Sequence, residues 1–248
     1  MIRSFFMAFS MYSRLPVPFV EWKEENRRYA LCFFPLIGVV IGGLLLIWQH
    51  FCVWAHIGVL VYAAGCVLIP ILVTGGIHMD GYLDVCDAKS SFGDREKLFE
   101  IMKDSHIGAF AAIHLVLYLL LQFALFSGVD SWQKMVVVGC GFVQSRAISA
   151  LAAVTFQNAK GEGTLQNFTK SAHRRTTIIA EFVLLAFAAA GMVIAGGLTG
   201  VVAFAAGVAV LAYYRWFSYR RFGGITGDLA GYFLQLCEIF ILAGAVFA

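Results

Sequence analysis

The sequence has little charge for its length. Only 13% of its 248 residues are charged, whereas 60% are apolar, and the mean hydropathy is +0.81. Soluble domains carry about 25% charged residues, so about half of the usual charge is missing. This shortage excludes an ordinary soluble domain, because so much apolar surface cannot all be buried in water. A lipid bilayer is the solvent that suits such a chain.

Three further absences narrow the interpretation. The net charge is only +3 and no Lys/Arg-rich stripe is present, which argues against a nucleic-acid partner. The six cysteines are scattered without a C-x-x-C pair, so neither a disulfide framework nor a zinc ribbon is indicated. Near the N-terminus, Arg14 and Pro16-Val17-Pro18 follow a short apolar stretch without a small-residue cleavage site. Residues 1–28 are therefore predicted to be a retained cytoplasmic or interfacial segment, not a signal peptide.

Seven stretches are long and apolar enough to cross a bilayer as helices, which takes about 20 residues each. They are Tyr29–Gln49, Val59–Ile77, Ile107–Phe126, Met135–Phe156, Thr177–Ala195, Leu198–Tyr214 and Tyr232–Ala248. Only Gly196-Gly197 separates the fifth stretch from the sixth, which predicts a tight helical hairpin. The predicted fold class is all-α, a polytopic transmembrane helical bundle of about seven spans that forms a single integral membrane domain over residues 1–248.

The distribution of lysine and arginine predicts the orientation of these spans. Sixteen of the 18 basic residues lie before the first span or in the connections after the second, fourth and sixth. On the opposite side only Lys134 is found, and Arg146 falls within a span. Because basic loops stay in the cytoplasm, the N-terminus is predicted to be cytoplasmic and the C-terminus outside. The protein is expected in the cytoplasmic membrane.

Acidic residues point to the same side. Seven of the fifteen lie between residues 80 and 104, in a predicted cytoplasmic loop over residues 78–106. On a helix, Asp80, Asp84 and Asp87 would project within an arc of about 60°, spread over about 10 Å. Like charges on one face repel, and a hard divalent cation such as Mg²⁺ would relieve the repulsion. The alternative is a solvated acidic loop balanced by neighbouring basic residues, but charge this close to a span is usually functional.

Three blocks of sequence resemble a known family. Gly75-Gly76-Ile77-His78-Met79-Asp80-Gly81, followed by Asp84 and Asp87, resembles the G-G-x-H-x-D-G-x-x-D-x-x-D signature of the cobalamin synthases, which are adenosylcobinamide-GDP ribazoletransferases. The stretch from Gly93 to Gly108 resembles the family's second block, and Gly223-Gly224-Ile225-Thr226-Gly227-Asp228 its third. The resemblance covers essentially the whole chain. At two positions, His106 and Lys160 replace an expected arginine, and lysine lacks the bidentate fork of arginine.

The resemblance implies a definite reaction. The enzyme would join the GDP-activated arm of adenosylcobinamide to α-ribazole or its 5′-phosphate, giving adenosylcobalamin or its 5′-phosphate and GMP in the last steps of cobalamin biosynthesis. A ribose hydroxyl would attack phosphorus while GMP leaves, and cation clamps supply most of the catalysis in such transfers. The implied cofactor is Mg²⁺. The expected partners are these small molecules and the lipid bilayer, while assembly into a homo-oligomer stays open.

The resemblance also implies site residues. Asp80, Asp84, Asp87 and Asp228 are assigned to the metal site, and one of the first three, with Asp80 foremost, or Asp104 is the expected general base. The expected substrate-binding residues are Gly76, His78, Gly81, Lys103, Ser105, Arg146, Arg221, Gly224 and Gly227.

Several of these residues have a second interpretation. The glycines of the third block are also typical of a turn and a helix start, with Asp228 as the cap. Arg221 is near enough in sequence to pair with Asp228 or to bind a phosphate. Arg146, in mid-span, must face a partner, a cavity or a substrate. Its alternative is an ion pair between helices, with Glu238 or Glu181.

Two rival classes fit the sequence less well. CDP-alcohol phosphotransferases also use an aspartate cluster, but they have Ala-Arg after D-G-x-x, where this chain has Asp84-Val85. A cation transporter would place its acidic residues inside the spans at mid-depth. Here the carboxylates cluster in one predicted loop and only Arg146 lies deep.

Overall fold

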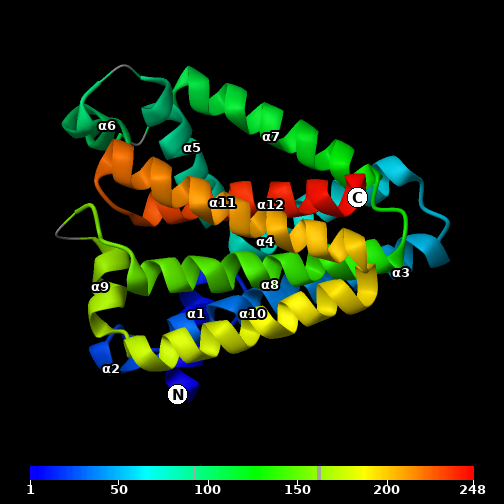
Figure 1. The fold of residues 1–248 in the computed structure, drawn as a ribbon, viewed down its shortest axis with the longest axis horizontal. Coiled ribbons are helices and arrows are strands. Elements are labelled where there is room, and N and C mark those ends of the chain that lie inside the picture. The colour runs from blue at the N-terminus through cyan, green and yellow to red at the C-terminus, as the bar shows by residue number, and fades with distance from the viewer. Residues whose placement is uncertain (92, 105, 161–162) are drawn as a thin grey trace.

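Long apolar helices make up most of the computed structural model, which describes residues 1–91, 93–104, 106–160 and 163–248 (Figure 1). Six helical segments are long and apolar enough to cross a membrane. They contain α3 (Phe34–Trp54), α7 (Ala109–Ser127), α8 (Trp132–Thr155), α10 (Arg174–Gly196), α11 (Leu198–Phe222) and α12 (Gly227–Phe247). A seventh crossing results if α4 (Val59–Thr74) and α5 (Ile77–Ser90) are counted as one bent span. The predicted polytopic helical bundle is confirmed.

Short helices gather at one end of this bundle. They are α1 (Ile2–Tyr12), α2 (Glu24–Arg27), the 3₁₀ turn η1 (Leu31–Phe33), α6 (Arg95–Ile101) and α9 (Thr164–Ser171). In Figure 1, α2, α6 and α9 lie at the left, together with the connection from α11 to α12, while the C-terminus lies at the opposite end. The left end is therefore the one that the basic residues predict to face the cytoplasm.

Helix α8 forms the centre of the bundle, where it contacts α3, α10, α11 and α12. Small residues let α3 approach it closely, since a Cβ on Gly42 would lie 2.9 Å from the Gly139 Cα. Such contacts replace the hydrophobic driving force that is absent between helices in lipid. Helices α7 and α10 lie at the periphery and expose large apolar side chains, among them Leu120 and Phe187. These exposed faces suit contact with lipid.

The second predicted span, Val59–Ile77, is too long. Helix α4 ends at Thr74 because Gly75 and Gly76 adopt left-handed backbone angles, with φ of 65° and 77°. The chain then turns by 96° into α5. Helices α5 and α6 make up much of the predicted acidic loop over residues 78–106, in agreement with the helical spacing of Asp80, Asp84 and Asp87. The acidic residues of the first block therefore lie on a fixed helical face.

The last two spans also differ from their predicted bounds. Helix α11 continues to Phe222 instead of ending at Tyr214, and Gly223, with φ of 77°, ends it. Helix α12 begins at Gly227 instead of Tyr232, so Asp228 lies in its first turn and not in a loop. Polar residues continue both helices, because a helix does not have to stop where its apolar stretch stops. The predicted hairpin between α10 and α11 is confirmed, with Gly197 alone between them.

Candidate active site

The acidic helix α5 lies directly against α12. Gly81 and Gly231 are the residues that permit this contact. A Cβ on Gly81 would lie 2.8 Å from both the Cα and the carbonyl oxygen of Asp228, and one on Gly231 would lie 2.9 Å from the His78 carbonyl oxygen. The two backbones thus touch where any side chain would separate them. This crossing brings Asp228 to the helix that carries Asp80.

Asp228 is held in place by a cap that another residue supplies. Thr226 is the N-cap of α12, and its Oγ1 accepts a hydrogen bond of 3.2 Å from the Leu229 amide. The interpretation of this segment as a helix start is therefore correct, but Thr226 and not Asp228 is the cap. Asp228 lies in the first turn, where the helix dipole favours a negative charge. Its carboxylate lies within electrostatic range of Asp80 and of Lys160.

Lys160 reaches this position through a short backbone pairing. The Ala159 amide donates to the Ile225 carbonyl, and the Ile225 amide donates to the Gln157 carbonyl, both at 2.9 Å. Gly224 allows the approach, since a Cβ there would lie 2.4 Å from the Gln157 oxygen. The connection from α8 to α9 is thereby joined to the third sequence block.

Helix α6 meets the same corner. The Lys160 ammonium lies 4.4 Å from the ring centroid of Phe99, within the range of a cation–π contact. The Arg95 guanidinium lies against Gly223, where a Cβ would come within 2.4 Å of its Nη1. The second and third sequence blocks are thus in contact, because Arg95 of the second block lies against Gly223 of the third.

Asp87 has a structural role that the sequence did not reveal. Its Oδ1 accepts a hydrogen bond of 3.1 Å from the Ala111 amide in the first turn of α7. Gly108, the N-cap of α7, leaves room for this carboxylate, which a Cβ at that position would meet. One oxygen of Asp87 therefore fixes the start of α7 against α5. The assignment of Asp87 to a metal site stays a prediction.

Two of the cavities that border α5 are large. The inner cavity, of 210 Å³, lies between α5, α12, α8, α3, α1 and α9. The outer cavity, of 390 Å³, lies between α5 and the connection from α6 to α7. Asp80 belongs to both linings, whereas Asp228 borders the inner cavity and Asp84 the outer. Asp84 lies within electrostatic range of Asp80, Asp228 and Asp87, so the acidic residues form one electrostatic unit.

Most of the predicted site residues meet at these cavities. His78, Gly81 and Gly227 line the inner cavity, and Lys103, Asp104 and Asp87 line the outer one. Gly76 is the N-cap of α5, and a Cβ added to it would meet nothing within 4 Å. The predicted contacts of these residues with substrate stay predictions.

Gly224 and Arg221 line neither of the two cavities. Gly224 is buried against the connection from α8 to α9, as described above. Arg221 is exposed at the end of α11, and the ion pairs of the described residues do not include one between Arg221 and Asp228. Ser105 lies outside the described residues.

Asp104 is an exposed carboxylate that its neighbour His106 stabilises. The His106 amide donates a hydrogen bond of 3.0 Å to Asp104 Oδ1, and the His106 Nδ1 lies 2.7 Å from the same oxygen. These hydrogen bonds lower the pKa of the Asp104 carboxyl below its usual range. A carboxylate with a lowered pKa is a weaker base. Asp80, at the junction of the two cavities, is therefore the better candidate for the general base.

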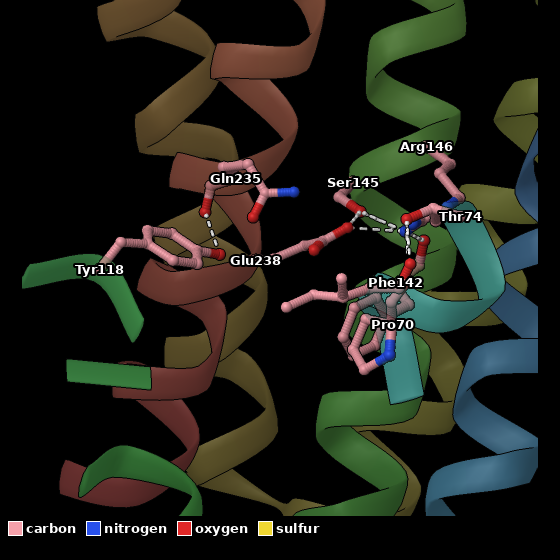
Figure 2. A network of polar contacts seen from close by, with 9 residues as sticks. Pro70, Thr74, Tyr118, Phe142, Ser145, Arg146, Gln235 and Glu238 are labelled. Carbon is pink, nitrogen blue, oxygen red and sulfur yellow. Dashed lines mark hydrogen bonds and ion pairs between the residues drawn. The ribbon is translucent and has the colours of Figure 1, made fainter. Parts of the chain in front are cut away.

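Arg146 has its partner on α12. Its Nη1 lies 2.7 Å from Glu238 Oε1 and also donates to the Phe142 carbonyl at 3.0 Å (Figure 2). The Ser145 hydroxyl donates to the same Glu238 oxygen at 3.4 Å. The Arg146 side chain is 1% exposed and lines neither the inner nor the outer cavity. The structure thus confirms the interhelical alternative, with Glu238 and not Glu181 as the partner.

One wall of the inner cavity was not predicted from the sequence. Met11 and Tyr12 of α1, Ala150 and Ala153 of α8 and Leu165 of α9 all line it. Small residues in α8 are typical of a close helix contact and also of a cavity wall, so the sequence does not distinguish between the two. Nothing in the N-terminal segment indicated that it reaches the acidic helix. The segment from residue 1 to 28 is thus part of the site.

The donor set suits one kind of metal ion. In the described part of the chain, His, Cys, Asp and Glu side chains do not converge in a group of three or more that could hold a metal by themselves. A cage made only of protein ligands is therefore not built. Mg²⁺ usually takes one or two carboxylates and completes its shell with water and substrate phosphates. Asp80 and Asp84, both on the outer cavity, fit that pattern.

Gly81→Ala is expected to reduce activity about 10²-fold, because a shift of about 1 Å at a reacting centre costs that much. The added Cβ would lie 2.8 Å from the Asp228 backbone, so α5 and α12 must separate. The unfolding free energy should fall by about 1–3 kcal/mol, as for other overpacked sites. Gly43→Ala in α3, where an added Cβ meets nothing within 4 Å, is the matched control. Equal activity of the two variants would contradict this account of the crossing.

Comparisons with known proteins identify the family of the chain. A model of the cobalamin-5-phosphate synthase family matches residues 4–246. The adenosylcobinamide-GDP ribazoletransferase of Lachnoclostridium phytofermentans is 43% identical over 96% of this chain and 91% of its own length. Those of Pseudomonas fluorescens and Desulfitobacterium hafniense are 34% and 32% identical, over 96% and 98% of this chain and 96% of each relative. No solved structure matches the chain. The chain therefore belongs to the cobalamin-5-phosphate synthase family.

Proposed function

We propose that this protein joins adenosylcobinamide-GDP to α-ribazole or α-ribazole 5′-phosphate, releasing GMP and forming adenosylcobalamin or its 5′-phosphate. The observation that carries the proposal is the position of Asp80, which borders two cavities of different polarity beside Asp84 and Asp228. A transfer between two substrates needs a site on each side of the reacting phosphorus, and a carboxylate at the junction. The names of the relatives supply the substrates.

Each part of the site has a role in this transfer. The acceptor's ribose hydroxyl attacks the phosphorus next to the cobinamide arm, and its proton passes to the Asp80 carboxylate. The bond from that phosphorus to the GMP oxygen breaks, and GMP leaves with the bonding electrons. Positive charge beside the phosphates favours such a transition state. Lys103 on the outer cavity and Lys160 near Asp228 supply it from the protein.

The proposed cofactor is Mg²⁺, which Asp80 and Asp84 would hold at the outer cavity. A bound magnesium ion would neutralise negative charge on the diphosphate and on the departing GMP. Asp228 lies on the inner side of the same electrostatic unit, where it would orient the acceptor. Asp87 would act through α7, whose first turn it fixes.

The proposed location is the cytoplasmic membrane, with the site facing the cytoplasm. Support comes from the basic residues, sixteen of which lie before the first predicted span or in the connections after the second, fourth and sixth. Of these segments, α2, α6 and α9 lie at one end of the bundle (Figure 1). A nucleotide-activated donor is available on that side. The inner cavity extends from this end toward α3 and α8, so the site lies at the border between water and the bundle core.

Purified protein in detergent or lipid is expected to form a cobamide and GMP in equal amounts from adenosylcobinamide-GDP and α-ribazole 5′-phosphate with Mg²⁺. Chromatography of both products is the measurement. EDTA should abolish both, and an excess of Mg²⁺ should restore them. Asp130→Asn, an exposed acid at the opposite end of the bundle, is the control and should behave as wild type. If folded wild-type protein forms no cobamide, the proposal fails, and CDP-alcohol donors are the next substrates to test.

A further inference from the structure

The inner cavity has an aromatic wall. Tyr12 of α1 and Phe34 of α3 pack with ring centroids 4.4 Å apart. The ring of His78, from α5, lies 6.4 Å from Tyr12 at an interplanar angle of 24° and 5.7 Å from Phe34 at 64°. All three residues line the cavity. Aromatic rings prefer other rings as offset or edge-to-face neighbours, so this wall suits a flat aromatic ligand.

The remaining walls are narrow and mostly apolar. Ala150 and Ala153 of α8 and Leu165 of α9 also line the cavity. A dry apolar cavity of about 150 Å³ binds benzene, so a cavity of 210 Å³ has room for a bicyclic aromatic base. A corrinoid ring is far larger and does not fit. The imidazole Nε2 of His78 is buried and has no hydrogen-bond partner among the described residues.

The outer cavity has the opposite character. Lys103, Asp84 and Asp104 line it, and the first turn of α7 closes it. It suits a charged diphosphate with its cation and does not suit a flat apolar ring. In a phosphoryl transfer the attacking and leaving oxygens lie roughly in line on opposite sides of phosphorus. With Asp80 at the junction, one reactant approaches from the inner cavity and the other departs through the outer one.

We infer that the inner cavity is the binding site for the planar base of the acceptor nucleoside, and that the outer cavity receives the diphosphate of the donor. The inference rests on the proposed function and deepens it. The base packs against Tyr12 and Phe34, which directs the ribose toward Asp80. The hydroxyl oxygen then forms its bond to phosphorus from the inner side, its proton passes to Asp80, and GMP departs on the outer side with the electrons of the broken bond.

Ala150→Leu tests this assignment, because it adds three carbons to the inner cavity. A single methylene in an apolar pocket changes specificity by about 10- to 200-fold. The KM for α-ribazole 5′-phosphate is expected to rise at least about tenfold, while the KM for adenosylcobinamide-GDP changes less than about twofold. Lys103→Gln is the matched variant of the outer cavity and should show the reverse pattern. A rise in the donor KM of Ala150→Leu would overturn the inference.

Binding of free benzimidazole, measured by equilibrium dialysis, gives a readout that does not depend on turnover. Wild-type protein and Lys103→Gln should bind it, whereas Ala150→Leu should bind it at least about tenfold more weakly. Equal binding by all three would overturn the inference even if wild type makes cobamide. Leu165→Ala, which enlarges the cavity from a partly exposed helix, serves if Ala150→Leu does not fold. It should improve kcat/KM for acceptors with a bulkier base, and an unchanged preference would overturn the assignment.

Discussion

Asp80→Asn is expected to lower kcat by at least about 10²–10³-fold, the usual loss when a group that acts on the transition state is removed. Asparagine has the size of aspartate, so the contacts of α5 stay in place. It has no negative charge to hold a cation and cannot take the proton of the attacking hydroxyl. Both losses fall on the chemical step, because Asp80 lies where the two cavities meet. GMP release at saturating concentrations of both substrates is the measurement.

Asp104→Asn is the comparison variant, because it tests whether Asp80 or Asp104 is the general base. Asp104 lines the outer cavity, but hydrogen bonds from His106 lower the pKa of its carboxyl and make it a weak base. Its replacement should reduce kcat less than about tenfold, the smallest effect expected of a general base being about 10²-fold. The opposite ranking of the two variants would identify Asp104 as the base. Thermal unfolding of both should match wild type.

Arg146→Met is expected to cost about 3–5 kcal/mol of stability, because breaking a buried ion pair leaves its other charge without a partner. The pair joins α8 and α12, and both side chains are almost wholly buried, at 1% and 4% exposure (Figure 2). Glu238 would then keep only the weak contact with the Ser145 hydroxyl. A charge in a membrane core without a partner is costly. Denaturant unfolding in mixed micelles, followed by tryptophan fluorescence, is the measurement.

The double variant Arg146→Met/Glu238→Leu distinguishes the contribution of the Arg146–Glu238 ion pair from the contribution of side-chain packing by Arg146. Replacing both members of a buried ion pair with apolar residues of similar size is often neutral or stabilising. The double variant is therefore expected to regain most of the stability that Arg146→Met loses, and to keep activity, since neither residue lines the two cavities. A double variant as unstable as the single one would show that arginine packs with its surroundings and does not act through Glu238.

The positions of the membrane spans could be predicted from the sequence, because a bilayer requires long apolar stretches. An apolar stretch of about 20 residues has few alternatives to a helix, and the seven stretches contain the centres of all the long helices. Their ends were harder to predict. Gly75-Gly76 breaks α4 at a place where the apolar stretch continues, and α11 and α12 extend beyond their apolar stretches. The ends of these helices depend on backbone angles and caps, and hydropathy gives no information on either.

The acidic face of α5 was predictable from spacing, but its neighbours were not. On a helix, the i, i+4, i+7 spacing places the three aspartates on one face, and this does not depend on contacts with the rest of the chain. The contact of Gly81 with Asp228 and the contribution of Tyr12 to a cavity join residues far apart in sequence. Hydropathy does not say which helices touch. Asp87 shows the same limit, since its bond to the Ala111 amide depends on where α7 begins.

The position of α12 has a consequence for the order in which the protein is made. Chains emerge from the ribosome N-terminal end first, so α12 is synthesised after α5 and α8. Before α12 is inserted, Arg146 lacks its ion-pair partner Glu238, and α5 lacks the helix surface against which Gly81 packs. A nascent chain that stops before α12 therefore has neither a closed core nor a complete site.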